Sequence, residues 1–561
     1  MNKNIIFSVM FLAAAPAGAQ VDQVNAFRLN IGMEAVSAEE AAANLAAVPA
    51  PRNEDLDETD RGLNSPEKIG DKIIALIIKH PKAMKTAEYP IIRLMAYAHS
   101  KGMLVPALEH VLRSPLMQRF LPPLPPNKRE DYIKKFPRMI AAQLEGTGYV
   151  HGVKGFEDWD KMSARHLGLM KASKYAPRRG VSLLNERGFV GELEGISGVP
   201  FEAGHTVTPL VDGIASFEAR ERLMRGAKKS IHLMVWGYYD DVTGRLTRDL
   251  LIAKKQEGLD VRVMVDGNIS NFIGMESLKL LAENGVPVGR FWDPERKYDG
   301  MHSKVLVVDG DYAITGGMNI GDKYSHLNPD AHKWRDTDVL FSGPAVAEAS
   351  QIFADTWNGV AASQGLPAMS ASAAASGEGT VRAALVYQRG GSEPAICLSL
   401  LKAIYGAGSS INIENAYFVT IPSLKTALAE AIERGVKVSI LTNSAQSNNE
   451  PILTSFILES LAEMKAAGAE IYVKEGETLH SKFMAVDGVF ATVGSYNFHP
   501  KSIRHEREVT LHVLDRGFAG QMEAVFAEDL SKAKKINNEE ELGLKDSPLN
   551  YIARRYMFDQ L

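Results

Sequence analysis

The sequence predicts an α/β protein made of two similar βα-layered lobes packed about a pseudo-two-fold axis and preceded by a mainly helical N-terminal domain. Helix-forming patterns fill residues 20–199. From about Val199 onward, short β-branched runs alternate with amphipathic helices, and this series occurs twice. The 561 residues, 45% of them hydrophobic, are enough for about three or four domains with ordinary cores.

The first 19 residues have the layout of a signal peptide. Lys3 precedes an apolar run from Ile5 to about Ala15, and the small residues Ala17-Gly18-Ala19 follow it. A membrane anchor needs about 20 apolar residues, so this run is too short to be one. We therefore expect residues 1–19 to be removed and the protein to be exported, to the periplasm or out of the cell.

Residues 20–199 are expected to form the helical domain, whose role the sequence does not indicate. Ser37-Ala38-Glu39-Glu40 has the order of a capping box, and Ser65-Pro66 precedes a second apolar-periodic run. No catalytic motif occurs in this region.

A duplication defines the rest of the chain, because Ser230 and Ser410 begin equivalent series 180 residues apart. The predicted lobes span residues 200–358 and 381–561, and an Ala-, Ser- and Gly-rich linker is expected at 359–380. The expected strand, helix and strand of each copy lie at 231–238, 245–257 and 261–266, and at 411–418, 424–433 and 436–442.

The strongest similarity between the copies is a polar motif. Nine of the 18 positions from His302 to Asn319 are identical to those from His480 to Asn497. Within a strand, side chains two residues apart point to the same side, so the His and Lys of each copy are expected to face one cleft. The motif residues are His302, Lys304, Asp309, Gly317 and Asn319 in the first copy, and His480, Lys482, Asp487, Ser495 and Asn497 in the second.

This doubled pattern, His-x-Lys-(four residues)-Asp-(six residues)-Gly-(Gly or Ser)-x-Asn, resembles the phospholipase D superfamily. The flanking segments Trp334-Arg335-Asp336-Thr337 and Asn415-Ala416-Tyr417-Phe418 look most like its bacterial phospholipase D and cardiolipin synthase branch. The resemblance covers about residues 200–561. It implies a phosphodiesterase or phosphatidyltransferase with His302, Lys304, Asp309, His480, Lys482 and Asp487 as catalytic residues.

Phosphodiester chemistry accounts for these residue types. Lys304, Lys482, Asn319 and Asn497 can surround the anionic oxygens, with Ser495 and Gly317 also predicted at the substrate. One imidazole attacks phosphorus to form a phosphohistidine, and the other protonates the leaving alcohol. The resemblance implies His302 as the nucleophile and His480 as the acid. It also implies that Asp336 and Glu508 orient the two imidazoles, one in each lobe.

Two features of the motifs depart from the resemblance. Gly317 stands where Ser is common, and His499 and Lys501 stand where cardiolipin synthases tend to carry Asp and Arg. We expect no cofactor and no metal, because the spacing of the remaining histidines fits no common ligand box. These histidines are His326, His332, His499, His505 and His512.

Three kinds of function fit such a chain: lipid headgroup chemistry, nucleic-acid cleavage, and non-catalytic membrane binding. The net charge of −5 disfavours a nucleic-acid partner, and a binding protein would not need both histidines. A phospholipid at a membrane surface is therefore the expected substrate, and no protein partner is inferred. The motifs leave hydrolysis and transfer open. Cardiolipin synthases usually begin with membrane helices and this chain with a signal-peptide pattern, so hydrolysis is favoured.

Overall fold

The computed structural model describes residues 62–79, 84–293, 299–373, 377–544, 550 and 558. The expected signal peptide at residues 1–19 and the capping box at Ser37 lie outside the described residues. Within the described part, no helix is both long enough and apolar enough to cross a membrane.

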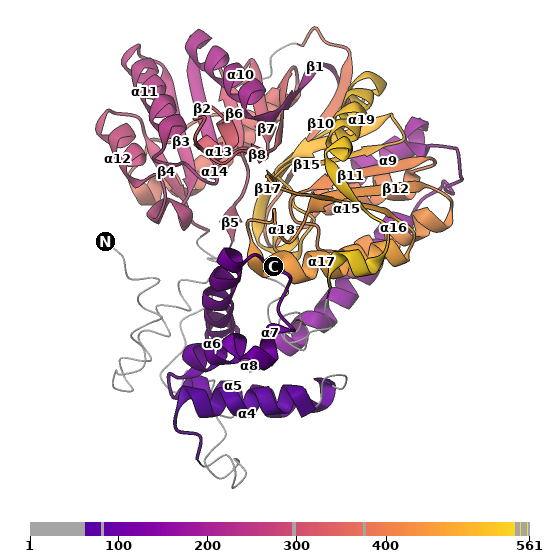
Figure 1. The fold of residues 1–561 in the computed structure, drawn as a ribbon. Coiled ribbons are helices and arrows are strands. Elements are labelled where there is room, and N and C mark those ends of the chain that lie inside the picture. Colours follow the sequence, from indigo (N-terminus) through magenta and orange to yellow (C-terminus); the bar gives the residue numbers. More distant parts are fainter. Residues whose placement is uncertain are drawn as a thin grey trace.

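Both lobes belong to one continuous mixed sheet of 16 strands (Figure 1). Its strand order is β18-β13-β12-β11-β15-β16-β17-β10-β1-β9-β7-β6-β2-β3-β4, with β5 paired to β17. The first lobe supplies β1 (Glu202–Val211), β2 (Ser230–Val235), β3 (Asp260–Asp266), β4 (Val288–Phe291), β5 (Gly300–Met301), β6 (Val305–Val308), β7 (Tyr312–Gly316) and β9 (Thr337–Ser342). The second supplies β10 (Val381–Gln388), β11 (Ser410–Asn415), β12 (Lys437–Asn443), β13 (Glu470–Lys474), β15 (Lys482–Val486), β16 (Phe490–Gly494), β17 (Glu506–Leu514) and β18 (Ala533–Ile536).

The strand order confirms the predicted pseudo-two-fold arrangement. β1 and β10 pair antiparallel at the centre of the sheet, with Glu202 opposite Ala383. Reading outward from this pair gives β9-β7-β6-β2-β3-β4 on one side and β17-β16-β15-β11-β12-β13 on the other, in the same order. The sequence did not predict how the lobes join, which is edge to edge through a single sheet.

Helices cover both faces of each half of the sheet. Successive side chains of a strand point to opposite faces, so a strand with only apolar residues needs a hydrophobic core on each face. In β6, Val305 and Val307 face one core and Leu306 and Val308 face another. The helices of the first lobe are α10 (Asp212–Gly226), α11 (Val242–Gln256) and α12 (Met275–Glu283) on one face and α14 (Ala345–Ala361) on the other. Their equivalents in the second lobe are α15 (Ala395–Gly406), α16 (Pro422–Glu433), α17 (Thr454–Ala466) and α19 (Arg516–Ser531).

Of the N-terminal helices, α8 (Pro126–Lys171) and α9 (Arg187–Ser197) pack on the second lobe, and the earlier ones pack on one another and on α8, below the lobes in Figure 1. Their side chains share one hydrophobic core with α15, α16 and α17. A buried Lys402 fixes this junction, since its Nζ lies 2.8 Å from Glu192 and donates to the Met170 carbonyl. The earlier helices are α4 (Pro66–Lys79), α5 (Met84–Ser100), α6 (Leu104–Arg113) and α7 (Pro115–Gln118).

The expected linker at 359–380 is more ordered than its composition indicates. Helix α14 continues to Ala361, so the first residues of the segment are helical. Beyond it, the Pro367 carbonyl accepts a hydrogen bond from the Trp357 indole at 2.9 Å. Leu366 and Met369 pack against the core under α14. These apolar side chains hold the first part of the segment on the first lobe.

Asp309 and Asp487 lie in the turns β6–β7 and β15–β16 and have a structural role. Asp309 accepts hydrogen bonds from the backbone amides of residues 228–230 at 2.6–3.1 Å, and Asp487 from those of residues 408–410 at 2.7–2.8 Å. Both adopt left-handed backbone angles, with φ values of 57° and 55°. His302 precedes the other end of β6, so roughly 20 Å of extended chain separates it from Asp309. Their predicted catalytic role is therefore wrong.

Replacing Asp309 should weaken the fold and spare the chemistry. The Asp309→Ala change leaves three amide donors without their carboxylate, so we expect a loss of about 1–3 kcal/mol in the free energy of unfolding, measured by urea denaturation. The matched control is Asp311→Ala in the same turn, where the side chain is exposed. A large fall in catalytic rate at unchanged stability would contradict the structural role.

Candidate active site

Each motif histidine follows a short strand that pairs with the opposite lobe. His302 comes directly after β5, which runs parallel to β17 of the second lobe. His480 comes directly after β14 (Thr478–Leu479), which pairs with β8 (Trp334–Arg335) of the first. The sequence predicted both histidines within the motif strands, whereas β6 begins at Val305 and β15 at Lys482. The short strands bring the two histidines to the boundary between the lobes.

The acids that orient the histidines also come from the opposite lobe. Nδ1 of His302 lies 3.1 Å from both carboxylate oxygens of Glu508. Nδ1 of His480 lies 2.7 Å from Oδ2 of Asp336. The two predicted acids therefore contact the two predicted histidines, and both contacts cross the boundary between the lobes. Because Nδ1 faces the acid in each pair, Nε2 is the nitrogen available for chemistry.

The two motif lysines are buried beside these histidines. Lys304 donates a hydrogen bond to the His302 carbonyl at 2.5 Å, and Lys482 donates to the His480 carbonyl. The Lys482 Nζ also lies 2.9 Å from Nδ1 of His480. Burial lowers the pKa of Lys304 to about 8 and that of Lys482 to about 7. An anionic phosphodiester bound between the two lysines would stabilise the charged form of each and so oppose this lowering of their pKa values.

Both motif asparagines are buried. Asn319 accepts a hydrogen bond from the Gly237 amide at 2.9 Å and donates one to the Tyr324 hydroxyl at 3.1 Å. The side-chain oxygen of Asn497 has no hydrogen-bond partner among the described residues. A buried polar atom without a partner is costly, so this amide is available to a ligand.

Ser495 and Gly317, which are predicted to lie at the substrate, contact the two acids. The Ser495 hydroxyl donates to Oε2 of Glu508 at 2.5 Å. A Cβ atom at Gly317 would clash with Oδ1 of Asp336, so glycine makes room for that carboxyl. Ser495 thus gives Glu508 a hydroxyl hydrogen bond that Gly317, at the equivalent position, cannot give to Asp336.

A second carboxylate, which is not among the predicted site residues, lies beside His302. Oε2 of Glu506 lies 3.9 Å from Nδ1 of His302, and the Ser502 hydroxyl bonds both Glu506 and Glu508 at 2.8 and 2.6 Å. Burial raises the pKa of Glu506, but His302 and Lys501 outweigh it, so this pKa is lowered and Glu506 is ionised. The period of two along β17 could have indicated it, since Glu506 and Glu508 point to the same side.

His499 and Lys501, which depart from the resemblance, lie around this second carboxylate. The Lys501 Nζ lies 3.5 Å from Glu506. His499 accepts a hydrogen bond from the Ser502 amide at 3.1 Å, which caps α18 (Pro500–Arg504). The two residues that depart from the resemblance therefore lie near Glu506, the additional carboxylate beside His302.

Aromatic rings enclose the two imidazoles. The Trp236 ring lies 6.1 Å from that of His302. Around His480, the rings of Tyr324, Trp334 and Tyr417 lie at 5.3, 5.1 and 6.3 Å. These rings remove water from around His480 and create the low polarity that shifts its pKa.

The Asp336–His480 pair can supply one proton. Burial, opposed by Lys482, raises the pKa of Asp336 to about 8. Burial followed by the charge of Lys482 lowers the pKa of His480 well below its usual value. The shared proton therefore rests on Asp336 at neutral pH, and it can move to Nδ1 of His480 as Nε2 donates its own proton. At His302, the carboxylates of Glu506 and Glu508 would stabilise a positively charged phosphohistidine ring.

Among the described residues, one group has the spacing of a metal site. The ligand atoms of His302, Glu506 and Glu508 lie within 4.8 Å of one another. Their carboxylates already accept hydrogen bonds from Ser495 and Ser502. We therefore interpret this group as one that orients the imidazole.

Comparisons with known proteins agree with this geometry. The family described as "Cardiolipin synthase, PLD-like domain" matches residues 221–357 and 400–530, one match in each lobe. Cardiolipin synthase A of Pseudomonas entomophila is 27% identical over 413 residues, which cover 72% of this chain and 83% of that protein. The Pseudomonas putida KT2440 enzyme of the same name is 29% identical over 348 residues, covering 61% and 72%.

One solved structure supports the fold. The crystal structure of phosphatidylserine synthase from Haemophilus influenzae Rd KW20 superposes with a TM-score of 0.52 at 16% sequence identity. The match covers 66% of this chain and 97% of that one.

Replacing either histidine should separate the two chemical steps. We expect His302→Ala and His480→Ala each to lower the rate by several orders of magnitude without unfolding the protein. With a nitrophenyl phosphodiester, whose leaving group needs little protonation, His480→Ala should still form the covalent intermediate. Labelled phosphorus should then accumulate on His302, because no residue activates the acceptor. Label on His480 in the reciprocal variant would reverse the predicted roles.

The rate should fall as the pH rises above about 8. Asp336, Lys304 and Lys482 all lose protons as the pH passes through 7–8, so the proton supply and both positive charges disappear. We expect a fall in kcat/KM steeper than the loss of one proton. With the nitrophenyl substrate the contribution of Asp336 should vanish and that of the lysines should remain. An unchanged kcat/KM up to pH 10 would contradict these assignments.

Proposed function

Because the chain belongs to the phospholipase D superfamily, in its cardiolipin synthase-like branch, we propose that it transfers phosphatidyl groups between phospholipids and alcohols. The observation that carries this proposal is the alignment with cardiolipin synthase A over 72% of this chain and 83% of the relative. The N-terminal pattern favoured hydrolysis, whereas the relatives support the alternative, transfer.

The proposed reaction has two displacements at phosphorus. Nε2 of His302 attacks, the bond to the departing alcohol breaks, and Nε2 of His480 gives that oxygen its proton. In the second step, His480 takes the proton of the acceptor alcohol, whose oxygen attacks phosphorus as the bond to His302 breaks. The lysines and asparagines would bind the anionic oxygens throughout.

The enclosure of the site supports an alcohol as the acceptor. His480 is only 4% exposed and lies among three aromatic rings, so bulk water has little access to the intermediate. In cardiolipin, two phosphatidyl groups share one glycerol, so the acceptor of a cardiolipin synthase is the hydroxyl of another lipid. We propose the same acceptor class here.

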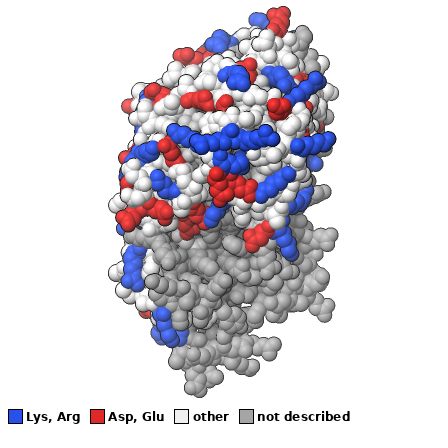
Figure 2. Space-filling view, turned by 90° about the vertical axis from the view of Figure 1, so that its right-hand side faces the viewer, with Lys and Arg blue, Asp and Glu red and all other residues white. Residues whose placement is uncertain are grey.

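The described surface supports a lipid substrate over a nucleic acid. Figure 2 shows a band of Lys and Arg on one face with Asp and Glu directly beside it. Several surface lysines of the second lobe are paired, as in Lys437–Glu470 at 3.1 Å and Lys425–Glu463 at 2.9 Å. Such pairs give no continuous basic track for a polyanion.

The products formed from phosphatidylglycerol vesicles test the proposal. The full chain should convert two phosphatidylglycerol molecules to cardiolipin and release one glycerol, as identified by mass spectrometry. Added glycerol should reverse the reaction and lower the yield of cardiolipin. The variant His302→Ala serves as the inactive control. Phosphatidic acid as the main product would favour hydrolysis, and cleavage of DNA with no lipid product would overturn the proposal.

We also propose that the protein is exported, on the evidence of the pattern in residues 1–19. N-terminal sequencing of the protein from the periplasmic or secreted fraction should then begin at Gln20. A bulky residue in place of Ala19 should slow this processing. Recovery of an intact Met1 from that fraction would contradict the proposal.

A further inference from the structure

The two lobes differ in what covers equivalent surfaces. In the second lobe, the loop between β12 and α17 lies under helix α8, where Lys128 donates to the Asn448 carbonyl at 2.6 Å. Ile452 and Leu453 of this loop are only 7% and 6% exposed. The equivalent loop of the first lobe joins β3 to α12, and there Phe272 and Met275 are 57% and 58% exposed.

Exposed apolar side chains gather at this uncovered edge of the first lobe. The described residues of the two lobes include six large hydrophobic side chains that are exposed. Five of the six lie near the ends of helices α10, α11, α12 and α13 (Asp322–Ser325). The second lobe contributes none of the six. We call the five the lobe-1 rim: Ile214, Leu246, Phe272, Met275 and Leu327.

The loop that carries Phe272 and Met275 adjoins the active site. Gly237 lies between Ile273 and Asn319, since a Cβ atom there would come within 3.2 and 3.6 Å of the two side chains. Trp236, next to Gly237, faces the His302 ring.

The other rim residues are also close in sequence to active-site contacts. Leu327 follows His326, which bonds the carbonyl of Trp334 at 2.8 Å, and the Trp334 ring lies against His480. Ile214 is two residues from Asp212, whose amide donates to the Asp336 carbonyl at 2.9 Å. The rim is therefore continuous with the surroundings of both histidines.

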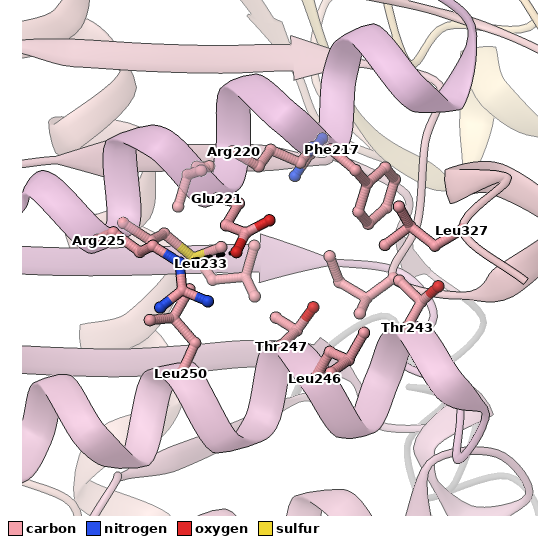
Figure 3. Close-up of a pocket in the computed structure, with 13 residues that line it drawn as sticks. Phe217, Arg220, Glu221, Arg225, Leu233, Thr243, Leu246, Thr247, Leu250 and Leu327 are labelled. Atoms are coloured by element: carbon pink, nitrogen blue, oxygen red, sulfur yellow. Dashed lines mark hydrogen bonds and ion pairs between the residues drawn. The ribbon is translucent and has the colours of Figure 1, made fainter.

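An apolar groove extends from the rim between α10 and α11. Figure 3 shows Leu246 and Leu327 at one end of this groove and Arg225 at the other. Leu233 of β2 and Leu306 of β6 contribute to its lining. In the second lobe, helices α8 and α9 pack against the equivalent helices α15 and α16. Among the described residues, no N-terminal helix shares a core with the equivalent helices α10 and α11 of the first lobe.

We propose that the lobe-1 rim is the surface by which the protein docks on a phospholipid bilayer. The inference rests on the proposed function, because a phospholipid substrate must reach the histidines from a membrane. A protein partner seated on the rim would cover the approach to the site, whereas a bilayer itself presents the substrate there. Apolar side chains at helix ends enter the boundary between headgroups and acyl chains, and several together give stable binding.

Vesicle binding tests the rim without requiring turnover. In a His302→Ala background, the rim variant carries Leu246→Ser, Phe272→Ser and Met275→Ser. The matched control carries Leu116→Ser, Val181→Ser and Tyr312→Ser, at positions that are also exposed but lie away from the rim. On vesicles of phosphatidylcholine and phosphatidylglycerol, we expect binding at least about tenfold weaker for the rim variant and nearly unchanged for the control. Equal binding by the two variants would overturn the proposal.

A labelling experiment covers the case in which the triple variant does not fold. Cys397 is the only cysteine and is buried, so a thiol placed at the surface can be labelled selectively. An environment-sensitive dye on Phe272→Cys should shift to the blue when vesicles are added, and the same dye on Tyr312→Cys should not. No difference between the two positions would contradict docking by the rim.

Kinetics separate failure of this inference from failure of the proposed function. In the active background, the rim variant should lower the ratio of the rate on vesicles to the rate on a monomeric short-chain phosphatidylglycerol by about tenfold. If the unmodified protein acts on neither lipid, the proposed function fails while the binding result remains interpretable. If it acts on both and the ratio is unchanged, the rim proposal fails. A lipid-free dimer that the rim variant abolishes would assign the surface to a second copy and also overturn the proposal.

Discussion

The active site depends on two hydrogen bonds that cross between the lobes. His302 faces Glu508 at 3.1 Å and His480 faces Asp336 at 2.7 Å, so each imidazole takes its orientation from the other half of the chain. A small rotation of one lobe against the other would break both contacts, because hydrogen bonds weaken steeply with distance and angle. The continuous sheet prevents such a rotation, since β1 and β10 join the lobes edge to edge and β5 and β14 each pair across the boundary.

A buried ionic network fixes the loop that carries Asp336. The Arg335 guanidinium forms three hydrogen bonds to Asp529 of α19, at 2.6–3.0 Å, and its carbonyl accepts a hydrogen bond from the His480 amide at 2.7 Å. Nearby, burial raises the pKa of Glu414 well above its usual value, so this acid is neutral beside Asp529. Arg335 of the first lobe thus links helix α19 through its side chain and the motif histidine His480 through its backbone carbonyl. Buried ion pairs of this kind fix geometry more than they add stability.

The sequence predicted the duplication, the helical region and the motif histidines and lysines, because all of these leave a periodic or repeated pattern, and the family resemblance added Asp336 and Glu508. It could not predict contacts between the lobes. Each copy has its own acid, and spacing within a copy does not reveal that Asp336 serves the histidine of the other. Asp309 was misassigned for a related reason: the motif gives its distance along the chain and not the end of β6 at which it lies. The positions of Gly317 and Ser495 depend on carboxylates more than ten residues away.

The proposed chemistry gives the two imidazoles different starting proton positions. The attacking nitrogen of the first must begin without a proton, whereas the corresponding nitrogen of the second must carry one. Here the environments differ in composition: two carboxylates and two serine hydroxyls surround His302, whereas a protonated Asp336, three aromatic rings and Lys482 surround His480. The surfaces differ too, since the described N-terminal helices share a core with the second lobe, whereas the rim side chains of the first lobe are exposed. A duplicated fold therefore supplies two histidines in matched positions, and the residues that differ between the copies give each of them a separate task.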